Sequence, residues 1–384
     1  MKTDRLLVLG LMGRYPLAGV GWQAVHYLVG LERLGWEVFY AEDSGAPPYS
    51  PGRIALGSDA EENVAFVRDV MASIGLADRW VYWDVLEDRH HGLGRDALEE
   101  LYATSAQIWN LCGATRPRAE HRRGGVLVYV QTDPGVEQAA AAAGDMDVAA
   151  MLEAHDVLFT YAERFGRPDC LVPVDRRRWL TTRPPVVLDF WESPPPRSGS
   201  PFTTVGTWEN RGKDVVHAGA LWRWSKHASF LDLIDVPARA GVRAEAALAP
   251  PDDVAARFRA SGWSLRDPRE VSASLEAYRD FVRSSCGELT ATKEIYVRSR
   301  SGWFSDRSAC YLAAGRPVVT ADTGLGDVLP CGRGLLAYRT PDEAVAALEA
   351  VRDDLPAHAR AARALAEEHF DALRVLGAML ERIR

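Results

Sequence analysis

The sequence predicts an α/β protein with two domains, each built on a Rossmann-like parallel sheet. Short β-rich apolar runs alternate with helical patterns along the chain, which is the pattern of βαβ units. A length of 384 residues suits two such domains better than one. The segment SPPPRSGSP, residues 193–201, interrupts the alternation and is too rich in proline to lie inside a sheet. We therefore expect this segment to be the linker.

The first domain is expected over residues 1–192. It begins with an apolar run at 5–10, a glycine-bearing loop at 12–21, a helical pattern at 22–34 and a second strand at 36–41. Strand, loop, helix and strand in this order predict parallel pairing. Further strands are predicted at 80–83, 107–111, 126–130, 156–161 and 170–174, and helices at 61–74, 96–105 and in an alanine-rich region up to 153.

The second domain is expected over residues 202–364. Its strands are predicted at 203–206, 243–249, 293–297, 317–320 and 335–338, and its helices at 226–234, 252–260 and 268–283. The tail from 341 to 384 has alanine and leucine at helical spacing. Its last helix, about residues 365–384, is expected to pack back on the first domain.

Composition excludes several classes of protein. The net charge of −8 and the lack of a long basic block argue against nucleic-acid binding. The five cysteines form no C-x-x-C pair, so we expect neither a zinc site nor a disulfide framework, but reduced thiols in the cytoplasm. The N-terminal apolar run is short and is followed by Arg14, which does not fit a signal peptide. No apolar stretch approaches the roughly 20 residues of a membrane span, so no stable membrane insertion is expected.

Residues 299–323, SRSGWFSDRSACYLAAGRPVVTADT, predict an anion site at a helix start. Ser305 is a suitable N-cap, and the first helical turn offers free backbone N–H groups together with Arg307 and the hydroxyl of Ser308. A diphosphate suits this combination of amides, dipole and guanidinium. The alternative is an ordinary capped helix with a surface Asp–Arg pair. The aromatic pair Trp303 and Phe304 precedes this helix, and we expect it to be exposed.

A second polar loop, residues 207–214 (TWENRGKD), follows the first strand of the second domain. Ligands of open α/β sheets bind at the carboxyl ends of strands, so Thr207, Arg211 and Lys213 are predicted to reach the same phosphates. The loop does not have the P-loop spacing. A solvated turn is the alternative.

In the first domain, Gly10, Gly13, Gly19 and Gly21 surround the turn after the first strand. They do not form the dinucleotide fingerprint G-x-G-x-x-G, although acids near the end of the second strand keep that alternative open. We interpret the glycines as allowing a ligand to approach the backbone. The residues expected to bind the acceptor are Arg14, Tyr15, Gly19, Gly21 and Gln23.

Two residues are candidates for a catalytic base. Asp133 follows a buried strand, and His155 precedes another. Helix capping is the alternative for Asp133, and a place at the edge of the core is the alternative for His155. Glu288 follows a helical pattern and is predicted to bond ribose hydroxyls, or else to be a surface acid. Lys293 is counted with the donor-binding residues.

Taken together, these segments resemble a GT-B glycosyltransferase, in which two Rossmann-like domains face a cleft. SGWFSDRSACYLAAGRPVV resembles the donor-binding segment of enzymes related to glycogen synthase and bacterial mannosyltransferases, and most of the chain resembles a bacterial group within this class. The resemblance implies that Gly302, Trp303 and Phe304 face the sugar and that Ser305, Arg307 and Ser308 hold the diphosphate. The paired glutamates of the retaining families fall here at Gly302 and Cys310, with Asp306 as a candidate substitute for one of them.

The function implied by the resemblance is transfer of a sugar from a nucleotide diphosphate sugar to a small-molecule or glycan acceptor (EC 2.4). No cofactor and no metal are expected, because GT-B enzymes usually stabilise the leaving diphosphate with a helix dipole and cations. The triplet Asp145-Met146-Asp147 matches the metal-binding D-x-D motif, but it lies in a helical region and is interpreted as chance. The alternatives are a nucleotide-sugar 2-epimerase and a non-catalytic nucleotide-sugar-binding protein.

Overall fold

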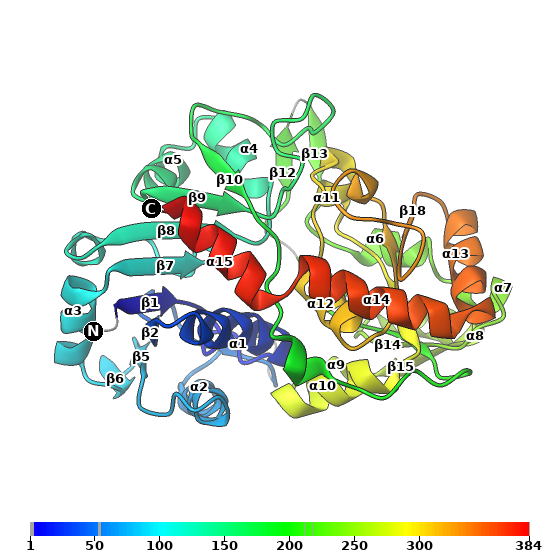
Figure 1. Ribbon diagram of the computed structural model, residues 1–384, viewed down its shortest axis with the longest axis horizontal. Coiled ribbons are helices and arrows are strands. Elements are labelled where there is room, and N and C mark those ends of the chain that lie inside the picture. The colour runs from blue at the N-terminus through cyan, green and yellow to red at the C-terminus, as the bar shows by residue number, and fades with distance from the viewer. Residues whose placement is uncertain (1–3, 53–54, 211, 218, 384) are drawn as a thin grey trace.

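The protein consists of two lobes, each built on its own sheet (Figure 1). The structure is a computed structural model that describes residues 4–52, 55–210, 212–217 and 219–383. Both large sheets are formed mainly by parallel strands with helices between them. The predicted fold class, α/β with two Rossmann-like parallel sheets, is confirmed.

The N-terminal lobe contains an eight-stranded sheet in the order β10-β9-β8-β7-β1-β2-β5-β6. Neighbouring strands are parallel, except that β6 pairs antiparallel with β5 at one edge. The strands are β1 (Arg5–Leu9), β2 (Glu37–Glu42), β5 (Trp80–Asp84), β6 (Arg89–Gly92), β7 (Gln107–Leu111), β8 (Val126–Gln131), β9 (Val157–Thr160) and β10 (Trp179–Thr181). The strand order reverses at β1, which has β2 on one side and β7 on the other.

The C-terminal lobe contains a six-stranded parallel sheet in the order β15-β14-β11-β16-β17-β18. Its strands are β11 (Phe202–Val205), β14 (Ala244–Ala247), β15 (Trp263–Arg266), β16 (Gly287–Thr290), β17 (Val318–Ala321) and β18 (Leu335–Tyr338). Two small antiparallel pairs complete the described strands: β3 (Tyr49–Ser50) with β4 (Ala55–Leu56), and β12 (Val215–His217) with β13 (Ala220–Trp222). This sheet reverses its order at β11, so each lobe has a reversal point where α/β sheets place ligands.

Helices connect the strands of both lobes. The N-terminal lobe has α1 (Ala18–Arg33), α2 (Glu61–Ser73), α3 (Arg95–Thr104), α4 (Val136–Ala142), α5 (Met146–Glu153) and the 3₁₀ turn η1 (Ala119–Arg122). The C-terminal lobe has α6 (His227–Leu231), α7 (Val236–Arg239), α8 (Asp252–Ala260), α9 (Pro268–Val271), α10 (Leu275–Ser284), α11 (Glu294–Ser299), α12 (Asp306–Ala313), η3 (Leu325–Asp327), α13 (Pro341–Asp353) and α14 (Leu355–His369). None of the described helices is long and apolar enough to cross a membrane.

The chain crosses between the lobes twice. It leaves the N-terminal lobe after η2 (Leu188–Trp191) and returns through α14 to α15 (Ala372–Ile383), which lies along α1 (Figure 1). A Cβ on Gly30 would lie 2.5 Å from Leu376 Cδ1, so the absence of a side chain at Gly30 allows this close approach.

A buried apolar seam joins the two lobes. Trp22 of α1 packs against Trp191 of η2 with ring centroids 4.8 Å apart, and its indole N–H donates to the Leu275 carbonyl at 2.9 Å. Phe304, before α12, and Phe370, after α14, continue the same buried cluster with ring centroids 5.1 Å apart. The lobes are therefore in extensive apolar contact, which agrees with the near-complete burial of these aromatic rings.

Two predicted strands are wrong. Residues 293–297 belong to helix α11 rather than to a strand, because tertiary contacts of Ile295 and Tyr296 override the β propensity of the sequence. Residues 170–174 form no strand. They belong to a loop whose backbone is fixed by the other lobe, since the Leu171 N–H donates to the Ser299 carbonyl at 2.7 Å.

Candidate active site

A cavity of about 580 Å³ lies between the lobes, at the carboxyl ends of both sheets. The segments after β1, β7 and β8 line it from the N-terminal lobe, and the segments after β11 and β16 line it from the C-terminal lobe. Its polar lining includes Tyr15, Gln23, Gln131, Thr132, Asp133, Glu137, Asn210, Lys213, Asp214, Lys293 and Asp306. This position, at the reversal points of two α/β sheets, is where the fold favours a ligand.

Asp133, predicted as a catalytic base, lies in this cavity directly after β8. It accepts hydrogen bonds from two groups of the other lobe, Lys293 Nζ at 3.0 Å and the hydroxyl of Tyr296. Burial would raise the pKa of Asp133, but the charge of Lys293 and these two hydrogen bonds outweigh it and hold the pKa below its usual range. Asp133 is therefore an ionised partner in an ion pair between the lobes.

Asp306 is the first residue of α12 and turns toward the N-terminal lobe. Gln23 Nε2 donates to its Oδ2 at 3.1 Å, and the hydroxyl of Tyr161 lies 3.4 Å from its Oδ1. Burial, with a smaller contribution from the negative charge of Asp133, raises the pKa of Asp306 to about 7. Its carboxyl group therefore exchanges a proton near neutral pH, in contrast with that of Asp133.

Arg307, the next residue of α12, turns into its own lobe. Its Nε forms an ion pair with Glu288, Nη1 donates to the Val205 carbonyl at 2.9 Å, and Nη2 donates to Thr290 Oγ1 at 2.7 Å. Glu288 is fully buried in β16, where its carboxylate serves as the counter-charge of Arg307. The guanidinium thus ties α12 to the ends of β11 and β16 and presents a positive charge beside Gly206.

Lys226 brings a second cation to the same place, and the sequence analysis missed it. A Cβ on Gly206 would lie 3.7 Å from both Lys226 Nζ and Arg307 Nη1. Burial lowers the pKa of Lys226, and the charges of Arg307 and Lys293 lower it further. The negative charges of Glu288 and Asp133 offset part of this lowering. An anion beside Gly206 would reduce the repulsion between the two cations.

Lys213 and Lys293 extend the cationic side of the cavity. Their Nζ atoms lie 5.1 Å and 3.3 Å from the centre of the Trp224 ring, which satisfies part of each charge. Both lysines line the cavity, whereas Thr207 is exposed outside its lining. Donor binding by the two lysines stays a prediction. The predicted Arg211 lies outside the described residues.

The predicted helix start is present, and α12 begins at Asp306 after Ser305 as N-cap. The Ser305 side chain makes no capping bond, and the buried hydroxyl of Ser308 has no partner among the described residues. Gly302 adopts a φ of +71° and donates its N–H to the Thr323 carbonyl at 2.7 Å. The loop before α12 therefore has a fixed backbone. The Ser308 hydroxyl in the first turn of α12 makes no hydrogen bond to the described residues.

The expected exposure of the aromatic pair is wrong. Trp303 and Phe304 are only 8% and 3% exposed, and neither lines the cavity. Trp303 stacks on Tyr296 with ring centroids 4.2 Å apart and donates its indole N–H to the Thr132 carbonyl at 2.7 Å. Both rings fill the seam between the lobes, a contact that only the folded chain creates.

The residues predicted to bind an acceptor divide into two groups. Tyr15, Gly19 and Gln23 line the cavity. Gly21 instead faces the other lobe, since a Cβ there would lie 3.0 Å from Leu275 Cδ2. The guanidinium of Arg14 lies over the Tyr15 ring, 5.1 Å from its centre, outside the cavity lining.

Glu42, at the end of β2, fastens the loop after β1. It accepts hydrogen bonds from the backbone N–H groups of Gly13 and Arg14, the latter at 2.7 Å, and from the Tyr40 hydroxyl at 2.5 Å. Burial raises the pKa of Glu42 to about 7 despite these bonds. The dinucleotide alternative requires a free acid at the end of this strand, and Glu42 is occupied by its own loop.

His155, the second predicted catalytic residue, does not line the cavity. Its Nδ1 lies 2.8 Å from the Met151 carbonyl, and its Nε2 lies 3.1 Å from Asn110 Nδ2. Burial lowers the pKa of His155 to about 4, so the ring is neutral at physiological pH. Both ring nitrogens are satisfied inside the N-terminal lobe, and we assign His155 to packing.

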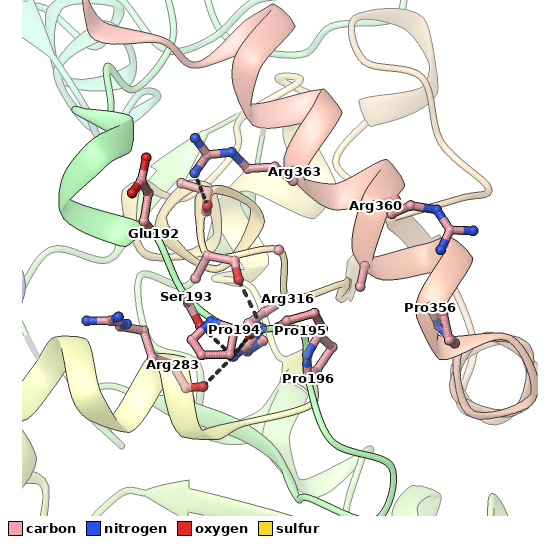
Figure 2. Close-up of a pocket in the computed structure, with 14 residues that line it drawn as sticks. Glu192, Ser193, Pro194, Pro195, Pro196, Arg283, Arg316, Pro356, Arg360 and Arg363 are labelled. Atoms are coloured by element: carbon pink, nitrogen blue, oxygen red, sulfur yellow. Dashed lines mark hydrogen bonds between the residues drawn. The ribbon is translucent and has the colours of Figure 1, made fainter.

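A second cavity, of about 880 Å³, lies at the other end of α12 between the linker and α14 (Figure 2). Arg316 donates there to Ser193 Oγ at 2.7 Å and to the carbonyls of Pro194 and Arg283 (Figure 2). Among the described residues that line this cavity, Glu192 is the sole carboxylate. Arg316 joins Ser193 and Pro194 to the C-terminal lobe, which is a structural role. We therefore assign the catalytic site to the cavity between the two sheets.

Within the described part of the chain, no three His, Cys, Asp or Glu side chains converge as metal ligands. Asp145 of the D-x-D triplet accepts hydrogen bonds from the N–H groups of Asp147 and Val148 and caps α5. That capping role accounts for Asp145. Metal-independent transfer stays a prediction.

Known proteins of solved structure resemble this chain in fold. No family model matches the sequence, and no curated protein matches it. Solved structures match nearly the whole chain. AviGT4, a glycosyltransferase involved in avilamycin A biosynthesis, has 15% identity and a TM-score of 0.57 over 99% of this chain and 97% of that chain. HepE from Anabaena in complex with UDP and glucose has 11% identity and a TM-score of 0.57, covering 99% of both chains.

Sucrose-phosphate synthase from Thermosynechococcus elongatus matches in the same way, with 12% identity and a TM-score of 0.55 over 99% of both chains. The chain has the GT-B fold. At these identities the likeness extends to the arrangement of the two lobes, and the roles of individual residues depend on the contacts described above.

Proposed function

We propose that this protein is a glycosyltransferase that moves a sugar from a nucleotide diphosphate sugar to a hydroxyl or amine of an acceptor. The observation that carries the proposal is the position of Lys226 beside Gly206, next to the helix α12 that the Arg307–Glu288 ion pair fixes in place. Burial and the charges of Arg307 and Lys293 lower the pKa of Lys226, and the negative charge of a diphosphate would favour its charged form. The GT-B fold supports the same class of reaction.

The two sides of the cavity have complementary chemistry. On the C-terminal side, the backbone N–H groups at the start of α12 would hold the diphosphate and stabilise its charge as it leaves, together with Lys213 and Lys293 in the cavity lining and Lys226 beside Gly206, outside that lining. On the N-terminal side, Tyr15, Gln23 and the backbone at Gly19 would hold the acceptor. These fixed charges support transfer without a metal ion, which we include in the proposal.

The test is to incubate the protein with UDP, GDP, TDP and ADP sugars, with and without EDTA, and to measure release of the nucleoside diphosphate. Hydrolysis or transfer that persists in EDTA is the expected outcome. An isomerised sugar would favour the 2-epimerase alternative, and tight binding without turnover would favour a binding protein. If no nucleotide sugar bound, the phosphate site at Gly206 would be wrong.

A further inference from the structure

The two carboxylates of the cavity, Asp133 and Asp306, are in different chemical states. Asp133 forms an ion pair with Lys293 across the cleft and accepts a hydrogen bond from the Tyr296 hydroxyl. The described contacts of Asp306 are with neutral groups, the amide of Gln23 and the hydroxyl of Tyr161. A carboxylate that is already bonded to an ammonium group is a weak proton acceptor, whereas one held by neutral donors keeps its basicity.

We propose that Asp306, rather than Asp133, is the catalytic base that takes the proton from the acceptor hydroxyl. This inference rests on the proposed function. As the acceptor O–H bond breaks, its proton passes to a carboxylate oxygen of Asp306, and the acceptor oxygen forms a bond to the anomeric carbon. The bond between that carbon and the diphosphate oxygen breaks, and the nucleoside diphosphate leaves with the electron pair. Atoms and charge balance without any further reactant.

The position of Asp306 suits this step. It lies on the helix whose first turn is assigned to the diphosphate, yet its side chain is turned toward Gln23 on α1, the acceptor side. It therefore stands between the group that leaves and the group that attacks. A base must reach the hydroxyl while the donor is bound, and a residue at this border meets that requirement.

A purely structural role for Asp306 is the alternative, because acids are common in the first turn of helices. Such acids are usually exposed and ionised. Asp306 instead lines a cavity and bonds to the opposite lobe. Burial raises its pKa to about 7, the range in which a carboxylate is both partly ionised and basic enough to accept a proton.

The groups that face Asp306 leave its titration distinct. The tyrosines and cysteines that interact with Asp306 all have pKa values raised by burial above their ordinary values. They therefore remain neutral at the pH values near 7 at which Asp306 titrates. They are Tyr27, Cys112, Tyr161, Tyr296 and Cys310. Asp133 is ionised at those pH values because its pKa is lowered. Glu137 in the cavity lining and Glu42 behind the loop after β1 also have pKa values raised by burial, so the loss of the limb in Asp306→Asn is the result that assigns it to Asp306.

The test is the pH dependence of kcat/KM for the wild type and for Asp306→Asn, with the nucleotide sugar that the wild type turns over. In the wild type, kcat/KM should fall tenfold per pH unit below about pH 7, because the base must be ionised. Asp306→Asn should lose about 10²- to 10⁴-fold in kcat/KM and should lose this limb. Its affinity for the nucleoside diphosphate should change less than threefold, which separates loss of a base from loss of binding.

Three further variants separate a catalytic role of Asp306 from a structural one. Asp280→Asn, on the exposed face of α10, should match the wild type. Asp133→Asn should retain the limb and move it to lower pH, because the negative charge of Asp133 contributes to the raised pKa of Asp306. Gln23→Ala should move the limb to higher pH, because the Gln23 hydrogen bond lowers the pKa of Asp306; this variant decides the question if Asp306→Asn does not fold.

A wild-type limb that survives in Asp306→Asn, or that disappears in Asp133→Asn, would overturn the assignment while the transferase function stands. Absence of turnover by the wild type with every nucleotide sugar would overturn both. Restoration of Asp306→Ala activity by added formate would support the proton-transfer role, since a small carboxylate can replace the missing base but cannot repair a structural defect.

Discussion

The loops after β1 and β11 occupy equivalent places in the two lobes, but their surroundings differ. In the N-terminal lobe, the acid Glu42 and the hydroxyl of Tyr40 bond the backbone of the loop after β1. In the C-terminal lobe, Gly206 of the loop after β11 borders Lys226, whose pKa is lowered by burial and by the charges of Arg307 and Lys293. The first loop is fixed by hydrogen bonds within its own lobe, while the second borders a cation whose charged form an anion would stabilise.

A charged side chain in a cleft is available to a ligand only when contacts within its own fold do not already satisfy it. Glu42 ends the second strand, where the dinucleotide alternative requires an acid, and the sequence predicts that Glu288 bonds ribose. In the structure, however, Glu42 bonds its own loop and Glu288 pairs with Arg307. Lys226 belongs to no motif, yet it lies beside Gly206, where an anion would stabilise its charged form. Four predictions, in order of decreasing expected effect, test this distinction; the first concerns a charge that the fold uses.

The largest effect on stability is expected for Arg307→Ala. Removing the guanidinium leaves Glu288 buried without its counter-charge, which costs about 3–5 kcal/mol of unfolding free energy. Urea unfolding measures this loss. Arg259→Ala, an exposed arginine of α8, should change the unfolding free energy by less than about 0.5 kcal/mol. If Arg307→Ala were as stable as the wild type, the fold would not depend on the Arg307–Glu288 ion pair, and Arg307 would be free for a ligand.

Lys226→Ala should mainly weaken nucleotide binding. A charge-assisted hydrogen bond contributes about 1.5–3 kcal/mol, so the dissociation constant for a nucleoside diphosphate should rise about 10- to 100-fold. Calorimetric titration measures it. The free energy of unfolding should not fall, because the substitution removes a repelled charge from beside Arg307. Unchanged affinity would remove Lys226 from the phosphate site.

Gly13→Ala should destabilise the fastened loop of the N-terminal lobe. A Cβ at Gly13 would lie 2.5 Å from Val67 Cγ2, and such overpacking costs about 1–3 kcal/mol. The same change at Gly19 is the matched control, because its Cβ would lie 3.6 Å from the nearest Tyr278 atom, an ordinary contact. Equal unfolding free energies for the two variants would contradict the role of Gly13 in packing.

The smallest effect is expected for Lys213→Ala. Lys213 is exposed and its described contact is the face of Trp224, 5.1 Å from the ring centre. Exposed charge interactions contribute about 0.2–1 kcal/mol, so the dissociation constant should rise no more than about fivefold. Titration under the same conditions as for Lys226→Ala measures the ratio. A larger loss than for Lys226→Ala would reverse the order of the two lysines.

Much of the fold was predictable because local patterns carry it. The apolar runs at 5–10, 203–206 and 317–320 each became a buried parallel strand, since β-branched and leucine-rich runs between glycine-bearing turns favour that state. The segment at 293–297 has the same local pattern and became a helix. There the contacts of Tyr296 with Asp133 and Trp303 decide the conformation, and these partners are distant in sequence.

The site was predictable in part for the same reason. The helix start at Ser305 and Asp306 is encoded by adjacent residues, and so is the position of Asp133 after its strand. Which of these side chains is free is not encoded locally. Arg307 and Asp306 are neighbours in the chain, yet one turns into its own lobe and the other toward α1.

The class of fold and the helix start at Ser305 could be predicted from the sequence alone. The burial of Trp303 and Phe304, the position of Lys226 near Arg307 and the opposite pKa shifts of Asp133 and Asp306 arise only in the folded chain. The physical reason is range: helix starts and strands depend on neighbouring residues, whereas burial and charge pairing depend on groups that meet only when the two lobes fold against each other.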